Sequence, residues 1–142
     1  LRFRADTTDH VINVNIRDQL NIRCPVYNKS VLNDEHHFEY SEIYSVPKWS
    51  YDNCVLTSEA KIVGVCRNSV IVPESIITVV FREFTPLPSG LEFTPGKSYY
   101  FITTSDGSQA GLSNRKGGLC STKNMKLKFI VHHQIQSKNL HI

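Results

Sequence analysis

Apolar and polar residues alternate with a period of two along most of this 142-residue chain. Ile12, Val14 and Ile16 are separated by asparagines, and a similar pattern occupies residues 20–24 and 125–132. Successive side chains of a strand point to opposite faces, so this period predicts strands with one face in the core and the other in water. No long segment has the period of 3.6 that marks an amphipathic helix. The chain is therefore expected to be all-β.

Further strands and the turns between them extend this prediction. Residues 61–66 and 98–104 are predicted strands, and the β-branched run 75–84 is predicted to be a more central one because it is almost continuously apolar. Helix is expected only as a turn or two near residues 110–114. Seven or eight short strands predict a β-sandwich or Greek-key barrel. The length predicts one domain over residues 1–142.

The composition argues against several classes of function. An apolar content of 40% and a charged content of 20% are typical of a folded globular protein. The formal net charge of +3 is small and the basic residues are scattered, so no nucleic-acid partner is expected. No apolar run approaches the ~20 residues of a membrane span, and no signal-peptide pattern follows Leu1. Any membrane anchor is expected to lie outside this chain.

The cysteines indicate an oxidising compartment. Cys24, Cys54, Cys66 and Cys120 are widely spaced, even in number and without a CxxC pair, which favours two disulfides. Four cysteines allow three pairings, and their spacing does not choose among them. An N-glycosylation sequon begins at Asn28 and supports secretion.

Metal and catalytic sites are not favoured by the residues present. Cys120 and Met125 lie in a loop before a strand, as the Cys and axial Met of a blue-copper site do, but no histidine stands between them. The adjacent pairs at 36–37 and 132–133 would point to opposite faces of a strand, and these histidines are expected to be solvated or bonded locally. No GxSxG or HExxH motif and no glycine-rich phosphate loop is present. We expect no metal, no cofactor and no catalysis.

The segment EFTPLPSGLEF, residues 83–93, places three apolar residues and two prolines in a predicted loop. Phe84 alone is equally well explained as the last core residue of the preceding strand. Leu87 is flanked by prolines, and a strand core does not easily reach the tip of a loop. Proline lowers the entropy cost of fixing such a loop on binding. A rigid apolar tip fits an anchor for a groove on a partner.

The segment from Phe81 to Cys120 resembles the ephrins, cell-surface ligands of Eph receptor tyrosine kinases. Ephrins have an F-S/T-P-x-x-x-G-x-E-F loop and then a Y-Y-x-I-S/T strand; here these read FTPLPSGLEF and YYFIT. The segment SDGSQAGLSNRKGGLC is similar to one in the B-type ephrins, and upstream DQLNIRCP, FEYSEIYSV and VCRNSV are similar to other ephrin motifs. The resemblance covers about residues 11–131, which is the expected core between flexible ends.

The resemblance implies a Greek-key β-barrel or sandwich of cupredoxin-like topology without copper. It implies the disulfides Cys24–Cys66 and Cys54–Cys120, each typically worth ~2–4 kcal/mol. It also implies a membrane-anchored glycoprotein that reaches the extracellular face of the plasma membrane by the secretory pathway. Such a ligand acts in contact-dependent cell guidance and migration.

The resemblance further implies that the loop inserts into a hydrophobic channel on the ligand-binding domain of an Eph receptor. Phe84, Pro86 and the tip at 87–91 would make the apolar contact, and Glu83 a polar contact at the channel rim. The predicted receptor-binding residues are Glu83, Phe84, Thr85, Pro86, Leu87, Pro88, Ser89, Gly90, Leu91 and Glu92.

One position departs from the family pattern. Ser89 stands where ephrins usually have a large apolar, aromatic or aliphatic residue, and loss of such an anchor typically costs a few kcal/mol. This marks a divergent ephrin, for which an invertebrate source is one interpretation. It also keeps open a guidance or adhesion ligand that has the ephrin fold but uses a non-Eph receptor. A copper electron carrier is the remote alternative.

Overall fold

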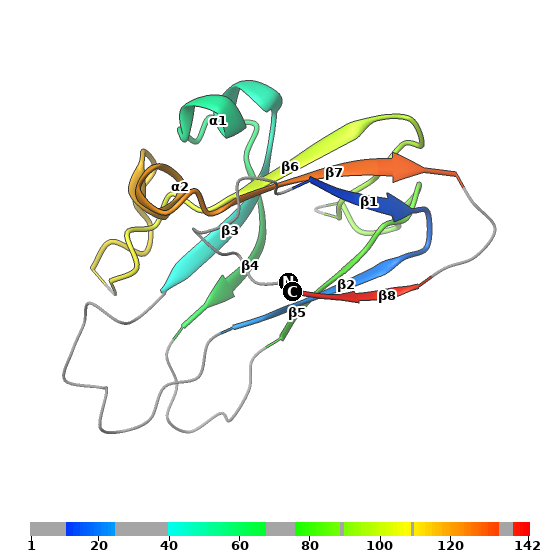
Figure 1. Ribbon diagram of the computed structural model, residues 1–142, viewed down its shortest axis with the longest axis horizontal. Coiled ribbons are helices and arrows are strands. Elements are labelled where there is room, and N and C mark those ends of the chain that lie inside the picture. The colour runs from blue at the N-terminus through cyan, green and yellow to red at the C-terminus, as the bar shows by residue number, and fades with distance from the viewer. Residues whose placement is uncertain (1–10, 25–39, 68–75, 89, 109, 134–137) are drawn as a thin grey trace.

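The computed structural model describes six parts of the chain, residues 11–24, 40–67, 76–88, 90–108, 110–133 and 138–142. Within these parts the chain forms eight strands and two short helices, and the strands are arranged in two sheets (Figure 1). The all-β fold class is confirmed. The sequon at Asn28, Ser89 and the histidine pair at 36–37 lie outside the described residues.

The larger sheet has five strands in the order β1-β7-β6-β3-β4. β1 pairs with β7 in parallel, and the other neighbours are antiparallel. Alternate residues of β7 are buried, as the period of two predicts. The strands are β1 (Val11–Asn15), β3 (Ser41–Val46), β4 (Lys61–Cys66), β6 (Ser98–Ile102) and β7 (Lys126–His132).

The smaller sheet has the order β5-β2-β8, with β2 (Gln19–Arg23) between β5 (Ile76–Val80) and β8 (Asn139–His141). The prediction that residues 75–84 form a central strand is wrong, because among the described strands β5 pairs only with β2 and lies at an edge. Its residues alternate between exposed and buried. β-Branched residues suit any pleated, half-buried surface, so their density does not distinguish an edge strand from a central one. β8 continues the paired structure beyond residue 131.

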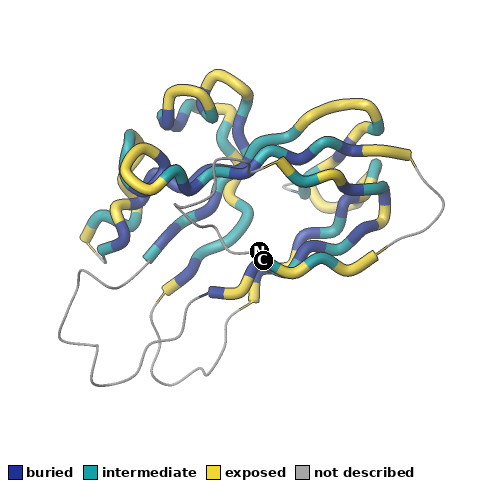
Figure 2. The backbone as a smooth tube through the Cα atoms, in the orientation of Figure 1, coloured by how far each residue is buried: buried dark blue, intermediate teal, exposed yellow. Residues whose placement is uncertain are grey.

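The main core lies between the two sheets. Its fully buried side chains include Leu20 from the smaller sheet and Phe101, Phe129 and Val131 from the larger one. The rings of Phe101 and Phe129 meet edge to face with centroids 4.8 Å apart. The alternation of buried and exposed positions along the strands is visible in Figure 2. The residues predicted to face the core therefore do so.

Two short helices lie near one end of the larger sheet (Figure 1), α1 (Lys48–Asn53) and α2 (Gly118–Thr122). The prediction of helix near residues 110–114 is wrong, because that segment forms turns. A second buried cluster includes Val46, Cys54, Leu56, Ile102 and Cys120, with Tyr51 of α1 packed against it. Burial against this cluster, rather than any periodicity of its six residues, accounts for α1.

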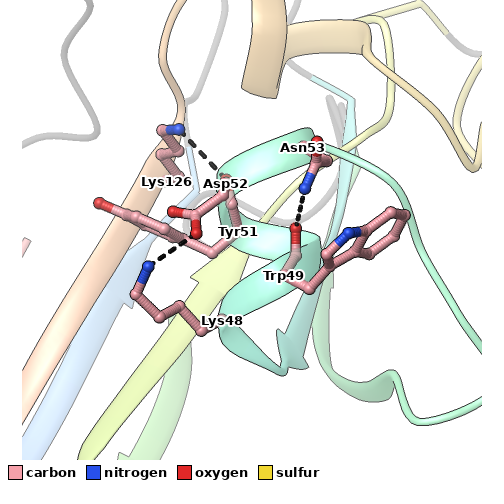
Figure 3. A network of polar contacts seen from close by, with 6 residues as sticks. All are labelled: Lys48, Trp49, Tyr51, Asp52, Asn53 and Lys126. Carbon is pink, nitrogen blue, oxygen red and sulfur yellow. Dashed lines mark hydrogen bonds and ion pairs between the residues drawn. The ribbon is translucent and has the colours of Figure 1, made fainter.

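Polar contacts attach α1 to the sheet (Figure 3). Lys126 of β7 donates a hydrogen bond to the backbone carbonyl of Tyr51 at 3.1 Å, and its Nζ lies 4.6 Å from the centroid of that ring. Lys48 Nζ lies 2.8 Å from the Asp52 carboxylate one turn further along the helix. The hydrogen bond to Asp52 raises the pKa of Lys48. This second pair is exposed, so it adds little to stability.

Two disulfides join segments far apart in the sequence, and they are the pairings that the resemblance implies. Cys24, directly after β2, is bonded to Cys66 at the end of β4, and this bridge joins the smaller sheet to the larger one. Cys54, directly after α1, is bonded to Cys120 in α2. Among the described residues there is no free cysteine.

Candidate functional site

The apolar loop, residues 83–92, connects β5 to β6 and is fixed at its base by buried aromatic residues. Phe81 and Phe93 are 0% and 1% exposed, and their rings meet edge to face with centroids 4.8 Å apart. The N–H of Phe93 donates to the carbonyl of Arg82 at 3.0 Å. The Phe93 ring also meets that of Tyr99 in β6, again at 4.8 Å. The two ends of the loop are therefore part of the core.

The turn between β1 and β2 secures the same base. Phe81 donates its N–H to the carbonyl of Asp18 at 2.9 Å and accepts the N–H of Arg17 at 2.7 Å. The Asp18 carboxylate is fully buried and accepts the N–H groups of Asn15 at 2.7 Å and Lys138 at 2.8 Å. Sequence reasoning missed this supporting role, although Asp18 opens the DQLNIRCP motif. The indication in the sequence was the position of Asp18 between two predicted strands, because a short polar side chain in a turn can accept hydrogen bonds from nearby backbone groups.

The residues beyond this base are exposed although they are apolar. Phe84 is 79% exposed and Leu87 is 65% exposed, the two highest values among the exposed large apolar side chains of the described residues. Phe84 is therefore not a core residue of the preceding strand, which was the competing interpretation. Pro86 and Pro88 are also exposed. Leu91 differs from the others, because it is half-buried and packs against the main core.

The remaining predicted site residues lie at the flanks of the tip. Thr85, Gly90 and Glu83 are half-buried, and Glu92 is exposed. Glu83 Oε1 lies 3.9 Å from His133 Nδ1, a contact that becomes an ion pair only when the histidine is protonated. The loop thus has an apolar tip with a carboxylate on either side.

A shallow depression of about 240 Å³ lies beside the loop base. Its lining includes Leu91, Glu92 and Phe93, together with Tyr99 of β6 and residues of β3 and β4. Glu59 and Lys61 contribute charges of opposite sign. The surface beside the loop base is therefore concave and mixed in polarity.

The cysteine considered above as a copper ligand, Cys120, cannot bind copper in this structure. Cys120 Sγ is bonded to Cys54 Sγ, so it is not a thiolate that could bind copper. Within the described ranges, no three His, Cys, Asp or Glu side chains gather closely enough to hold a metal ion. His132 of β7 has a partner on the neighbouring strand, with Nε2 2.8 Å from Asn13 Oδ1 of β1. In the part of the chain that the structure describes, no helix is long and apolar enough to span a bilayer.

The fold and the loop define a disulfide-crosslinked, two-sheet β domain with a projecting apolar loop. The family model described as Ephrin matches residues 1–131. Ephrin-B1 of Gallus gallus is 35% identical over 119 residues, which cover 82% of this chain and 33% of the relative. Ephrin-4 of Caenorhabditis elegans is 30% identical over 142 aligned residues, covering 84% of this chain and 40% of the relative.

Solved structures give the same result. A chain in the crystal structure described as the human ephrin A2–ephrin A1 complex superposes with a TM-score of 0.64 at 25% identity. The match covers 87% of this chain and 85% of that one. The chain therefore belongs to the ephrin family. It spans about a third to two fifths of the length of the curated relatives named above.

Proposed function

We propose that this chain is the receptor-binding domain of an ephrin-type ligand, and that it binds the ligand-binding domain of an Eph receptor through its apolar loop. Phe84 and Leu87 would enter an apolar channel on the receptor, with Glu83 and Glu92 at its rim. The function is recognition rather than catalysis. The other predicted loop residues, Thr85, Pro86, Pro88, Ser89, Gly90 and Leu91, would shape or support the tip.

The observation that carries this proposal is the exposure of two large apolar side chains on a loop whose base is fixed. A contiguous exposed apolar patch with a polar rim is typical of an interaction site. Full burial of such a side chain contributes roughly 1.5–3 kcal/mol, so covering the exposed 79% of Phe84 and 65% of Leu87 would contribute roughly 1.2–2.4 and 1.0–2.0 kcal/mol. Because the base is already part of the core, less conformational entropy is lost on docking than for a free loop.

The test is a binding screen by surface plasmon resonance against the Eph ectodomains and other guidance receptors of the source organism. Phe84→Asp and Leu87→Asp are expected to weaken Eph binding by at least about thirtyfold, the loss of ~2 kcal/mol that defines a hot spot. Ile62→Asp is the matched control, because Ile62 is 54% exposed but lies in β4. Normal Eph binding by Leu87→Asp would show that the loop is not the anchor.

The same screen examines the alternative that the partner is a guidance or adhesion receptor outside the Eph family. The family position occupied by Ser89 motivates that alternative. Binding to such a receptor, with no response from any Eph ectodomain, would favour it. The copper-carrier alternative lacks support, because its cysteine ligand is held in a disulfide.

We further propose that the domain acts at the extracellular face of the plasma membrane, held there by an anchor outside this chain. Its two disulfides fit an oxidising compartment. N-glycosylation at Asn28 would fit the same route. Contact-dependent guidance signalling would follow when receptors on a neighbouring cell are clustered.

A further inference from the structure

We infer that Thr85 and Gly90 are positioning residues, which hold Leu87 in one backbone conformation before a partner binds and so set the rate of docking. This inference rests on the receptor-binding function proposed above. It concerns how the loop is prepared for binding rather than which atoms touch the receptor.

Hydrogen bonds inside the loop use both backbone polar groups of Leu87. Its N–H donates to Thr85 Oγ1 at 3.3 Å. Its carbonyl oxygen accepts the N–H of Gly90 at 3.0 Å. A threonine hydroxyl that accepts the N–H two residues later stabilises a turn. Pro86 and Pro88 restrict φ on either side, so the backbone of Leu87 is held while its side chain stays exposed.

Thr85 and Gly90 also approach each other closely. A Cβ atom at position 90 would lie 2.5 Å from Thr85 Cγ2 and 2.6 Å from Thr85 Oγ1, closer than real Cβ contacts allow. Gly90 is not among the glycines with positive φ. Glycine is therefore needed at this position for space rather than for its backbone conformation. Threonine is stiff at χ1, so a displaced Thr85 would withdraw its hydroxyl from the Leu87 N–H.

The contacts of Thr85 and Gly90 act on the segment of the loop that the core does not fix. Phe81 and Phe93 are buried at the base, and Leu91 packs against the core, whereas Phe84 and Leu87 have little support of their own. If the tip samples several conformations, only the competent fraction can dock, and the apparent affinity falls by that fraction. Thr85 and Gly90 thus keep the competent fraction high.

A positioning role makes a kinetic prediction that differs from that of a contact role. Loss of preorganisation lowers the association rate, because fewer molecules are ready to bind, and leaves the contacts of the bound state intact. Loss of a contact mainly raises the dissociation rate. Thr85→Val keeps the shape of the side chain and removes the hydroxyl, whereas Thr85→Ser keeps the hydroxyl.

The kinetic test uses stopped-flow mixing with an Eph ligand-binding domain that binds the unmodified chain. Thr85→Val and Gly90→Ala are expected to associate about tenfold more slowly, with dissociation rates within about twofold and unchanged thermal midpoints. Thr85→Ser, which keeps the hydroxyl, should retain most of the association rate of the unmodified chain. The Gly90→Ala effect should shrink in a Thr85→Ala background, where the steric conflict is reduced. A faster dissociation of Thr85→Val with an unchanged association rate would overturn the proposal.

A second measurement needs no partner and separates this proposal from the proposed function. Amide hydrogen exchange at Leu87 in the free chain should be several-fold faster in Thr85→Val than in the unmodified chain. Equal exchange rates would overturn the positioning role whether or not a receptor binds. Absence of binding to every Eph domain would overturn the proposed function and the kinetic prediction, and faster exchange in Thr85→Val would still support the positioning of Leu87.

Discussion

Phe84 in the apolar loop and Phe93 at the base of that loop are predicted to affect different properties when replaced by alanine. Phe84 is 79% exposed, whereas Phe93 is 1% exposed and meets the rings of Phe81 and Tyr99, each at 4.8 Å. Phe84→Ala should reduce receptor binding and leave stability almost unchanged. Phe93→Ala should reduce stability by loosening the core beneath the loop.

The magnitudes follow from burial. Full burial of a phenylalanine side chain contributes roughly 1.5–3 kcal/mol, so the buried fifth of Phe84 contributes roughly 0.3–0.6 kcal/mol. Phe93→Ala removes a buried ring and leaves a cavity, which costs about 3–5 kcal/mol. Its two edge-to-face contacts place the expected cost in the upper part of that range. Such a loss is a large fraction of the ~5–15 kcal/mol that stabilises a typical domain.

The assay is equilibrium unfolding in guanidinium chloride under non-reducing conditions, followed by far-UV circular dichroism. The free energy of unfolding is compared at constant m, so that a shift in midpoint reports stability. Phe93→Leu is the matched control for Phe93→Ala, because it keeps most of the apolar volume. The reasoning is refuted if Phe93→Ala loses less than about 1 kcal/mol, or if Phe84→Ala loses more than about 1.5 kcal/mol.

Three further predictions concern the rest of the domain. Non-reducing peptide mapping should find Cys24–Cys66 and Cys54–Cys120, and a free Cys120 would contradict this pairing. Cys54 and Cys120 are 66 residues apart, so replacing this pair should lower the free energy of unfolding by about 4 kcal/mol according to the chain-entropy relation. Hydrogen bonds from Ser108 lower the pKa of Asp106. The unmodified chain should therefore be more stable than Ser108→Ala above pH ~3.9, the ordinary pKa of an aspartate, and this difference should disappear as the pH falls through the lowered pKa of Asp106. Because Asp106 is exposed, this difference should stay below about 1 kcal/mol, and a pH-independent difference in denaturation midpoints would count against it. Gly118→Ala should lower the thermal midpoint more than Gly96→Ala does. Both glycines have positive φ, but only a Cβ at position 118 would meet backbone oxygens, at 2.0 Å and 2.4 Å. Equal decreases in the thermal midpoint would exclude this steric cause.

The fold class followed from the sequence because each half-buried strand alternates in hydrophobicity. The same reasoning failed for β5, since β-branched residues suit an edge strand facing water as well as a central one. It also failed for α1. Six residues have no measurable helical period, and this helix depends on burial of Tyr51 and a hydrogen bond from Lys126, which lies 75 residues further along the chain.

The position of the apolar loop was predictable from the sequence, but the burial of its individual side chains was not. The prolines and apolar residues of the loop marked an unusual surface, but the sequence alone left Phe84 equally divided between core and loop. Phe84 and Phe93 are chemically identical, and only the neighbours brought by other strands decide which of them is buried. The buried Asp18 was missed for the same reason, because its partners at 15, 81 and 138 come together only in the folded chain.

The central claim is that the loop tip is buried in an Eph receptor, and hydroxyl-radical footprinting of the free and receptor-saturated chain measures this directly. Oxidation of Phe84 and Leu87 should be high in the free chain, where both are exposed, and should fall several-fold in the complex. Ile62, which is 54% exposed in β4, should be oxidised equally in both states. Unchanged oxidation of Phe84 and Leu87 in a saturated complex would contradict the claim.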